Sequence, residues 1–153
     1  MTDPLVETWQ IHDRINLYLL KAVPKEALGL AIGAKHRTVF QLFAHMHNVR
    51  LMWLKAPAPD LMEGLSKLEG DNGDKAALES ALKASGEAIG ALVERSQASG
   101  GKVKGFKPHA TAFVGYLISH ESHHRGQVGW TPKATGHPLD KKTAYGMWEW
   151  GVR

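Results

Sequence analysis

The sequence predicts an all-α fold: an antiparallel, up-down four-helix bundle with a short C-terminal aromatic segment. Two observations lead to this prediction. Four segments repeat apolar residues at helical spacing, and each is bounded by residues that stop or cap helices. Strand signals are nearly absent, because no segment sustains an alternation of apolar and polar residues. Four amphipathic helices without strands bury their apolar stripes in a bundle, so residues 1–153 are expected to form a single domain.

The first two helices are predicted from their apolar stripes and their ends. The first covers about residues 7–22 and is stopped by Pro24, whose ring removes a backbone donor. The second begins near Thr38 and ends before Pro57. Thr38 and Gln41 have the spacing of a capping box, in which each side chain binds the backbone amide of the other residue.

The third and fourth helices are delimited in the same way. Asp74 is a good N-cap for the third, and the Ser-Gly-Gly at 99–101 ends it. The fourth starts around Pro108, which suits a first helical turn, and runs toward Pro132. A Gly/Pro turn then leads to the aromatic segment AYGMWEWGV at 144–152, which we expect to pack across the bundle as a lid or tail.

Composition excludes several classes of protein. The chain has no cysteine, so it has neither disulfides nor thiolate metal ligands. No apolar stretch approaches the ~20 residues that span a bilayer, and the N-terminus lacks the features of a signal peptide. We therefore expect a soluble cytoplasmic protein without a membrane partner. The net charge of +4 comes from scattered residues, which favours a solvated basic surface over nucleic-acid binding.

Two of the nine histidines lie on the core-facing side of the fourth helix. At about 100° per residue, His124 lies about 40° from His120, and the apolar residues Phe113 and Leu117 lie at about 20° and 60°. A single core histidine is more often a hydrogen-bonded packing residue. Two at positions i and i+4 of one apolar stripe are both desolvated and can reach one ion, which favours metal binding.

The second helix is expected to supply a third ligand. His45 and His47 lie on opposite flanks of its apolar stripe, about 200° apart, so only one of them can face the site. Residue geometry alone leaves open which one, and the alternative for either is a half-exposed histidine. His123 lies at the edge of the stripe on the fourth helix and is expected at the surface or behind the ligands.

Residues 120–124 read HESHH and satisfy the H-E-x-x-H pattern of zinc proteases, in which Glu121 is the general base. The longer pattern of one protease class fails, because Gln127 replaces its glycine and Trp130 its third histidine. Matches of five residues also arise by chance. A zinc protease is therefore the less favoured interpretation. Glu121 is nevertheless the best candidate for a general base in any reaction at this site, and the alternative is an exposed helix carboxylate.

Three segments, in their order and spacing, resemble the DinB-like family of four-helix-bundle metal proteins: FAHMHNVRLMWL, ISHESHHRGQV and YGMWEWG. The similarity covers about Thr38 to Trp150, and the His-Arg-Gly-Gln run at 124–127 is its most specific part. After Gln127 the chain departs from the family, because Pro132 interrupts what is usually a longer final helix.

The resemblance implies a site made of His45, His120 and His124 that holds one divalent transition metal ion, zinc or nickel. It favours His45 over His47, because His45 stands eight residues before Trp53. It also implies a homodimer and a small-molecule substrate, with a low-molecular-weight thiol as a possible partner. Since the chain has no cysteine, any thiol comes from the substrate side.

The leading hypothesis is a metal-dependent enzyme, a thiol-dependent S-transferase or a hydrolase, with Glu121 as its catalytic residue. Its main rival is a noncatalytic, metal-stabilised stress or binding protein. Arg125 is expected to anchor an anionic substrate or to pair with an acid in the bundle. Trp148 and Trp150 are expected to wall the pocket or to form a dimer contact. Polar residues expected to orient the histidines or hold a water are Gln41, Asn48, Glu121 and Gln127.

Overall fold

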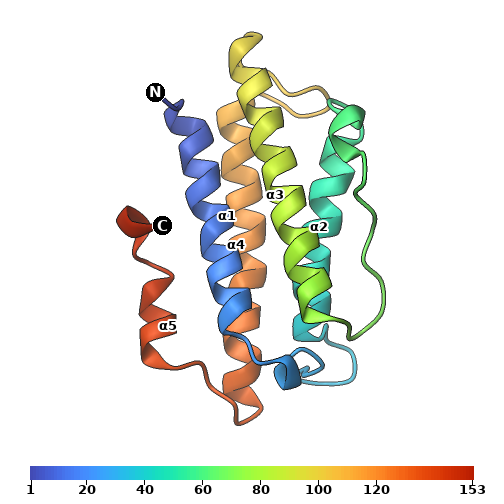
Figure 1. The fold of residues 1–153 in the computed structure, drawn as a ribbon, viewed down its shortest axis with the longest axis vertical. Coiled ribbons are helices and arrows are strands. Elements are labelled where there is room, and N and C mark those ends of the chain that lie inside the picture. Colours follow the sequence, from blue (N-terminus) through green and yellow to red (C-terminus); the bar gives the residue numbers. More distant parts are fainter.

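A computed structural model describes residues 1–153, and its four long helices lie side by side (Figure 1). The helices are α1 (Pro4–Ala22), α2 (Val39–Leu54), α3 (Lys75–Ala98), α4 (Ala110–Ala134) and the short α5 (Lys141–Gly146). Single 3-10 turns lie at Lys25–Ala27, Pro59–Met62 and Trp150–Val152. The only β feature is one isolated bridge, so the all-helical prediction is confirmed. None of the helices combines the length and the apolar character needed to cross a membrane.

The starts of α2 and α3 follow the predicted caps, whereas α1 begins earlier than predicted, at Pro4 after the N-cap Asp3, and α4 begins at Ala110 after the N-cap His109. Thr38 and Gln41 form the capping box at the start of α2, and the Asp74 carboxylate accepts from the amide of Ala77 at the start of α3. The expected interruption at Pro132 is wrong, because α4 continues through it to Ala134. Pro132 lies in the last turn of α4, where a missing backbone donor affects only the end of the helix.

The connection between α2 and α3 overturns the predicted up-down order. Phe40 and Leu78, near the starts of the two helices, belong to one core cluster, whereas Leu54 and Leu92, near their ends, belong to the other. The two helices are therefore parallel. Residues 55–74, which connect them in the chain, return along the length of the bundle (Figure 1). This return is sterically easy, because an extended chain covers about 3.3 Å per residue and a helix only about 1.5 Å.

Helices α1 and α4 run together in the opposite direction to α2 and α3 (Figure 1). At the start of α3, the Lys75 ammonium donates to the carbonyl of Val23, just after the end of α1, at 2.6 Å. Halfway along the bundle, His12 of α1 meets Glu121 of α4 at 2.8 Å. Each of the two helix pairs is thus internally parallel, and the two pairs are antiparallel to each other.

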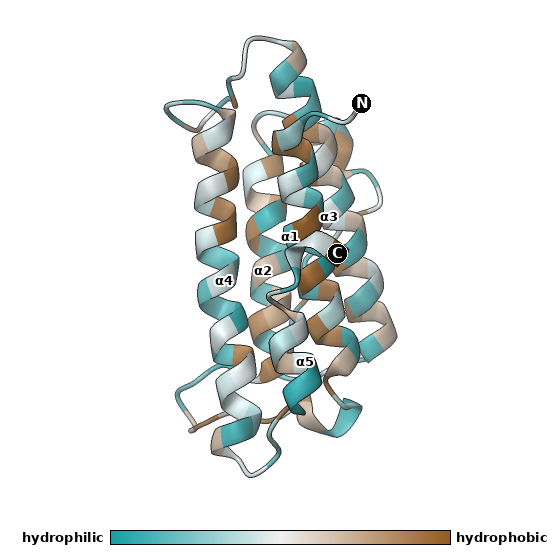
Figure 2. Ribbon diagram, turned by 90° about the vertical axis from the view of Figure 1, so that its left-hand side faces the viewer, coloured by the Kyte–Doolittle hydropathy of each residue, from teal (hydrophilic) through white to brown (hydrophobic).

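The core consists of two apolar clusters separated by a polar layer. One cluster surrounds Trp9 and Phe113, and the other surrounds Leu19 and Phe43. Figure 2 shows the same division on α4, which is apolar in its first half and hydrophilic in its middle. Buried polar residues fill the layer between the clusters: His12, Asp13, Asn16, Arg50, Ser85 and Glu121.

Helices α1 and α3 approach each other closely at Gly86. The indole of Trp9 donates to the carbonyl of Gly86 at 2.8 Å, and the carboxylate of Asp13 lies against the glycine Cα. A Cβ atom at this position would overlap with that carboxylate. The missing side chain therefore makes room for a buried acid in the polar layer.

Gly86→Ala is expected to destabilise the protein by about 1–3 kcal/mol, because its methyl group forces Asp13 out of place. Gly115→Ala on α4 is the matched control, since nothing lies within 4 Å of the added Cβ. The control should gain about 0.5–1 kcal/mol from the better helix propensity of alanine. Urea unfolding followed by circular dichroism measures both variants. A stabilising effect at both positions would contradict the close approach at Gly86.

Candidate metal centre

The structure brings His45 of α2 together with His120 and His124 of α4. One ring nitrogen from each histidine lies within 4.8 Å of the others. The Nε2 atom of His120 is 3.2 Å from Nε2 of His45 and 3.2 Å from Nε2 of His124. His47 is buried elsewhere, where its Nε2 atom donates to the carbonyl of Ser66 at 2.8 Å. The two α4 histidines therefore meet the α2 histidine that the family resemblance favoured.

The spacing of these nitrogens fits a single ion. Imidazole nitrogens that bind zinc at about 2.0–2.1 Å in a tetrahedral site lie about 3.3 Å apart. Hydrogen bonds alone do not account for both short contacts of Nε2 of His120, because a neutral imidazole nitrogen carries either one proton or one lone pair and so fully serves only one neighbour. The Nδ1 atom of His124 donates to Oε1 of Gln127 at 2.7 Å, which leaves the lone pair on Nε2 facing the other two rings. The donor set is thus suited to a divalent transition metal.

Burial lowers the pKa of all three imidazoles. Desolvation is the largest cause for His45, followed by the charge of Arg37 and the neighbouring histidines, and the pKa of His45 falls to about 4. Desolvation is also the largest cause of the lowered pKa of His120 and of His124. Metals bind neutral imidazole, so the site favours the protonation state that ligation requires.

Glu121 lies beside His120 in sequence, but its carboxylate belongs to the polar layer. Its Oε1 atom accepts from Nε of Arg50 at 2.6 Å, and its Oε2 atom accepts from Nη2 of Arg50 at 2.8 Å. His12 and Asn16 of α1 also donate to Oε2, each at 2.8 Å. Burial alone raises the pKa of Glu121, but the charge and hydrogen bonds of Arg50 and His12 outweigh it and lower the pKa to about 2.

These contacts bear on the role expected for Glu121. The sequence left open an exposed helix carboxylate, and this alternative is wrong because the side chain is 1% exposed. A general base must reach the proton that it removes, whereas this carboxylate is held by Arg50 and α1. The general-base role stays a prediction that the contacts do not favour, and the zinc-protease hypothesis meets the same difficulty.

Sequence reasoning missed Arg50, which is fully buried. Its guanidinium pairs with Asp13 at 2.9 Å as well as with Glu121. A signal was present, because Arg50 follows Met46 by four residues on the core-facing side of α2. Burial raises the pKa of Asp13 to about 6, the charge of Arg50 opposes that rise, and the nearby charge of Glu121 adds to it.

The remaining polar candidates have separate roles. Gln41 caps α2, and Asn48 binds the backbone of Leu68 through both its oxygen and its nitrogen. Arg125 donates to Asn16 at 2.8 Å and forms no ion pair with an acid. His123 is exposed, with its ring centroid 5.1 Å from that of His124.

The aromatic tail does not cover the three histidines. Helix α5 lies beside α1 (Figure 1), where the guanidinium of Arg153 stacks 3.8 Å above the ring of Tyr18. Trp148 and Trp150 line a hollow against Gly126 of α4, and none of the three histidines takes part in it. The expected packing of the tail against the bundle is therefore observed, at a place away from the candidate metal centre.

A sequence model described as the DinB family matches residues 1–147, which include all five α-helices and all three histidines of the cluster. No curated protein matches the chain.

The buried Asp13 should make the stability of the protein depend on pH. Its pKa of about 6 in the folded state exceeds the unfolded value of about 3.9, so the folded state holds this proton more tightly. This contribution is complete below about pH 3.9 and is lost as the pH rises through 6, a change of about 3 kcal/mol. Asp13→Asn removes this contribution. The free energy of unfolding of the variant minus that of wild type should therefore increase between pH 4.5 and pH 7. Denaturant unfolding at both values measures this difference, and a difference independent of pH would contradict the assignment.

Proposed function

The chain belongs to the DinB family, and we propose that it is a metal-dependent enzyme acting on a small molecule. His45, His120 and His124 are proposed to bind one divalent transition metal ion. The observation that carries the proposal is the convergence of their three ring nitrogens within 4.8 Å. Imidazole donors suit both zinc and nickel, the two ions that we propose for this site.

Three histidines supply fewer donors than a closed structural site does, and this leaves positions for a substrate. When bound there, the ion supplies a Lewis acid that can polarise a carbonyl or hold a thiol substrate as its thiolate. The chain itself provides no thiol, because it contains no cysteine. Thiol-dependent S-transfer and hydrolysis are the two reaction classes that we propose.

The residues around the histidines support this proposal by fixing their orientation. Gln127 accepts from Nδ1 of His124 and so directs the unprotonated Nε2 of that ring toward the other two. The ring of Tyr116 stacks on His120, with centroids 6.2 Å apart. We propose a positioning role for Glu121, since its ion pair with Arg50 joins α4 to α2, the two helices that carry the ligands.

Metal content is the first test. Untagged wild-type protein, purified and analysed for its elements, should contain about one equivalent of zinc or nickel, or take it up when the ion is added. His124→Ala should lose most of this metal, because a His-to-Ala change removes one of three ligands. The matched control is His123→Ala, which removes an exposed neighbour on the same helix and should retain the metal.

The outcomes separate the proposal from its rivals. Wild-type protein that neither contains nor takes up a transition metal would mean that the histidines only pack against one another, and the enzyme proposal would fail with the site. A metal-loaded protein that turns over no thiol or ester substrate and has no exchangeable water on the metal would favour the noncatalytic, metal-stabilised protein.

Glu121→Gln tests the positioning role. The change removes one of the two acids that neutralise Arg50, so the free energy of unfolding should fall by about 3–5 kcal/mol. The folded fraction of this variant should still bind metal, since Glu121 is not among the proposed ligands. Thermal unfolding and metal content, measured on the same sample, give both results. A variant with wild-type stability that loses turnover alone would instead support the general-base role.

A further inference from the structure

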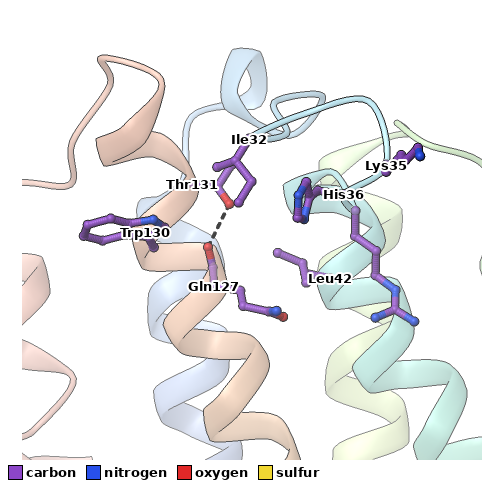
Figure 3. Close-up of a pocket in the computed structure, with 8 residues that line it drawn as sticks. Ile32, Lys35, His36, Leu42, Gln127, Trp130 and Thr131 are labelled. Carbon is purple, nitrogen blue, oxygen red and sulfur yellow. Dashed lines mark hydrogen bonds between the residues drawn. The ribbon is translucent and has the colours of Figure 1, made fainter.

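A hollow of about 380 Å³ lies at the end of the bundle next to the candidate metal centre. Its walls are the loop before α2 and the last turns of α4 (Figure 3). In Figure 3 the side chains of His36 and Leu42 face those of Gln127 and Thr131 across the space. The volume falls within the range of about 300–1,000 Å³ that is usual for small-molecule sites.

Two residues connect this hollow to the three histidines. Gln127 lines it and also holds the imidazole of His124. Arg37 lines it and also lines a neighbouring hollow of about 350 Å³ that contains His45. A molecule in the first hollow therefore lies beside both helices that carry the proposed ligands.

The walls of the first hollow carry positive charge without a balancing acid. Lys35, His36 and Arg37 follow one another in the chain and all line it. None of its lining residues is acidic, and neither Lys35 nor Arg37 belongs to an ion pair. The neighbouring hollow differs, since Glu69 lies there with Arg37. An anion is therefore favoured in the first hollow.

Apolar side chains complete the same walls. Leu42 is buried at the back, while Ile32 and Trp130 are 47% and 57% exposed at the rim. Exposed apolar groups of this size next to cationic groups suit a ligand that is apolar along its body and anionic at one end.

We propose that this hollow binds the substrate, and that the substrate is a small organic anion. Its carboxylate or phosphate group binds Arg37, its apolar part lies against Ile32 and Trp130, and its reactive group points toward the three histidines. The guanidinium of Arg37 suits this role because its planar donors match both kinds of oxyanion. The assignment rests on the proposed function, since it places the substrate of that same site.

The test is calorimetric titration of zinc-loaded protein with 3-phenylpropionate, phenyl phosphate and the neutral 3-phenylpropionamide. Wild-type protein should bind at least one of the anions about ten-fold more tightly than the amide, the size of a charge-assisted hydrogen bond. Arg37→Gln should lose this preference and keep its zinc. Lys104→Gln, which removes a charge from the loop between α3 and α4 at the other end of the bundle, should keep both. The more tightly bound anion tells which oxyanion the hollow selects.

Repeating the titration on metal-free wild-type protein distinguishes the two proposals. A preference for the anion that depends on Arg37 without metal supports the hollow even if the chain proves not to bind zinc or nickel. A preference that survives in Arg37→Gln would mean that the anion binds the metal or another surface, and it would overturn the assignment. Equal binding of all three probes by wild-type protein would overturn it as well.

Discussion

The guanidinium of Arg50 is the contact on which the arrangement of the bundle depends, because it touches all four long helices. It extends from α2 to Asp13 on α1, to the carbonyl of Leu82 on α3 and to Glu121 on α4. An arginine buried without partners would cost several kcal/mol, so every helix that supplies a partner is held at one height. A slip of α1, α2 or α4 by one turn would separate Arg50 from a charged partner, and a slip of α3 would remove the Leu82 carbonyl that accepts from it. The apolar clusters above and below could repack.

The direction of the helices decides where the metal centre lies. Since α2 and α4 are antiparallel, His45 in the first half of α2 faces His120 and His124 near the middle of α4. The loop that leads into α2 lies at the same end of the bundle, and it carries the basic residues at 35–37. The metal ligands and the cationic hollow are therefore neighbours because of topology, although they come from different parts of the chain.

Sequence reasoning succeeded where local chemistry decides the structure. Thr38 and Asp74 marked helix starts through their own side chains, and the spacing of His120 and His124 placed both on one face. It failed on the direction of α3, because an apolar stripe has the same period in either direction and residues 55–74 allow both. Glu121 was ambiguous for a related reason, since its position on α4 does not reveal that a buried arginine of α2 faces it. The choice between the two α2 histidines required the resemblance to a family.

The separation of the ligands along the chain links metal binding to the order of folding. His45 and His120 lie far apart in sequence, on helices that α3 and its two connections separate along the chain. In a partly folded chain whose α4 has not docked on α2, a metal ion can bind His120 and His124 together but not His45 as well. Contacts between distant segments form late, after the entropy of closing the intervening loop has been lost. A metal ion would thus be bound by all three rings only late in folding, and once bound it would slow the separation of α2 from α4 and so the unfolding of the bundle.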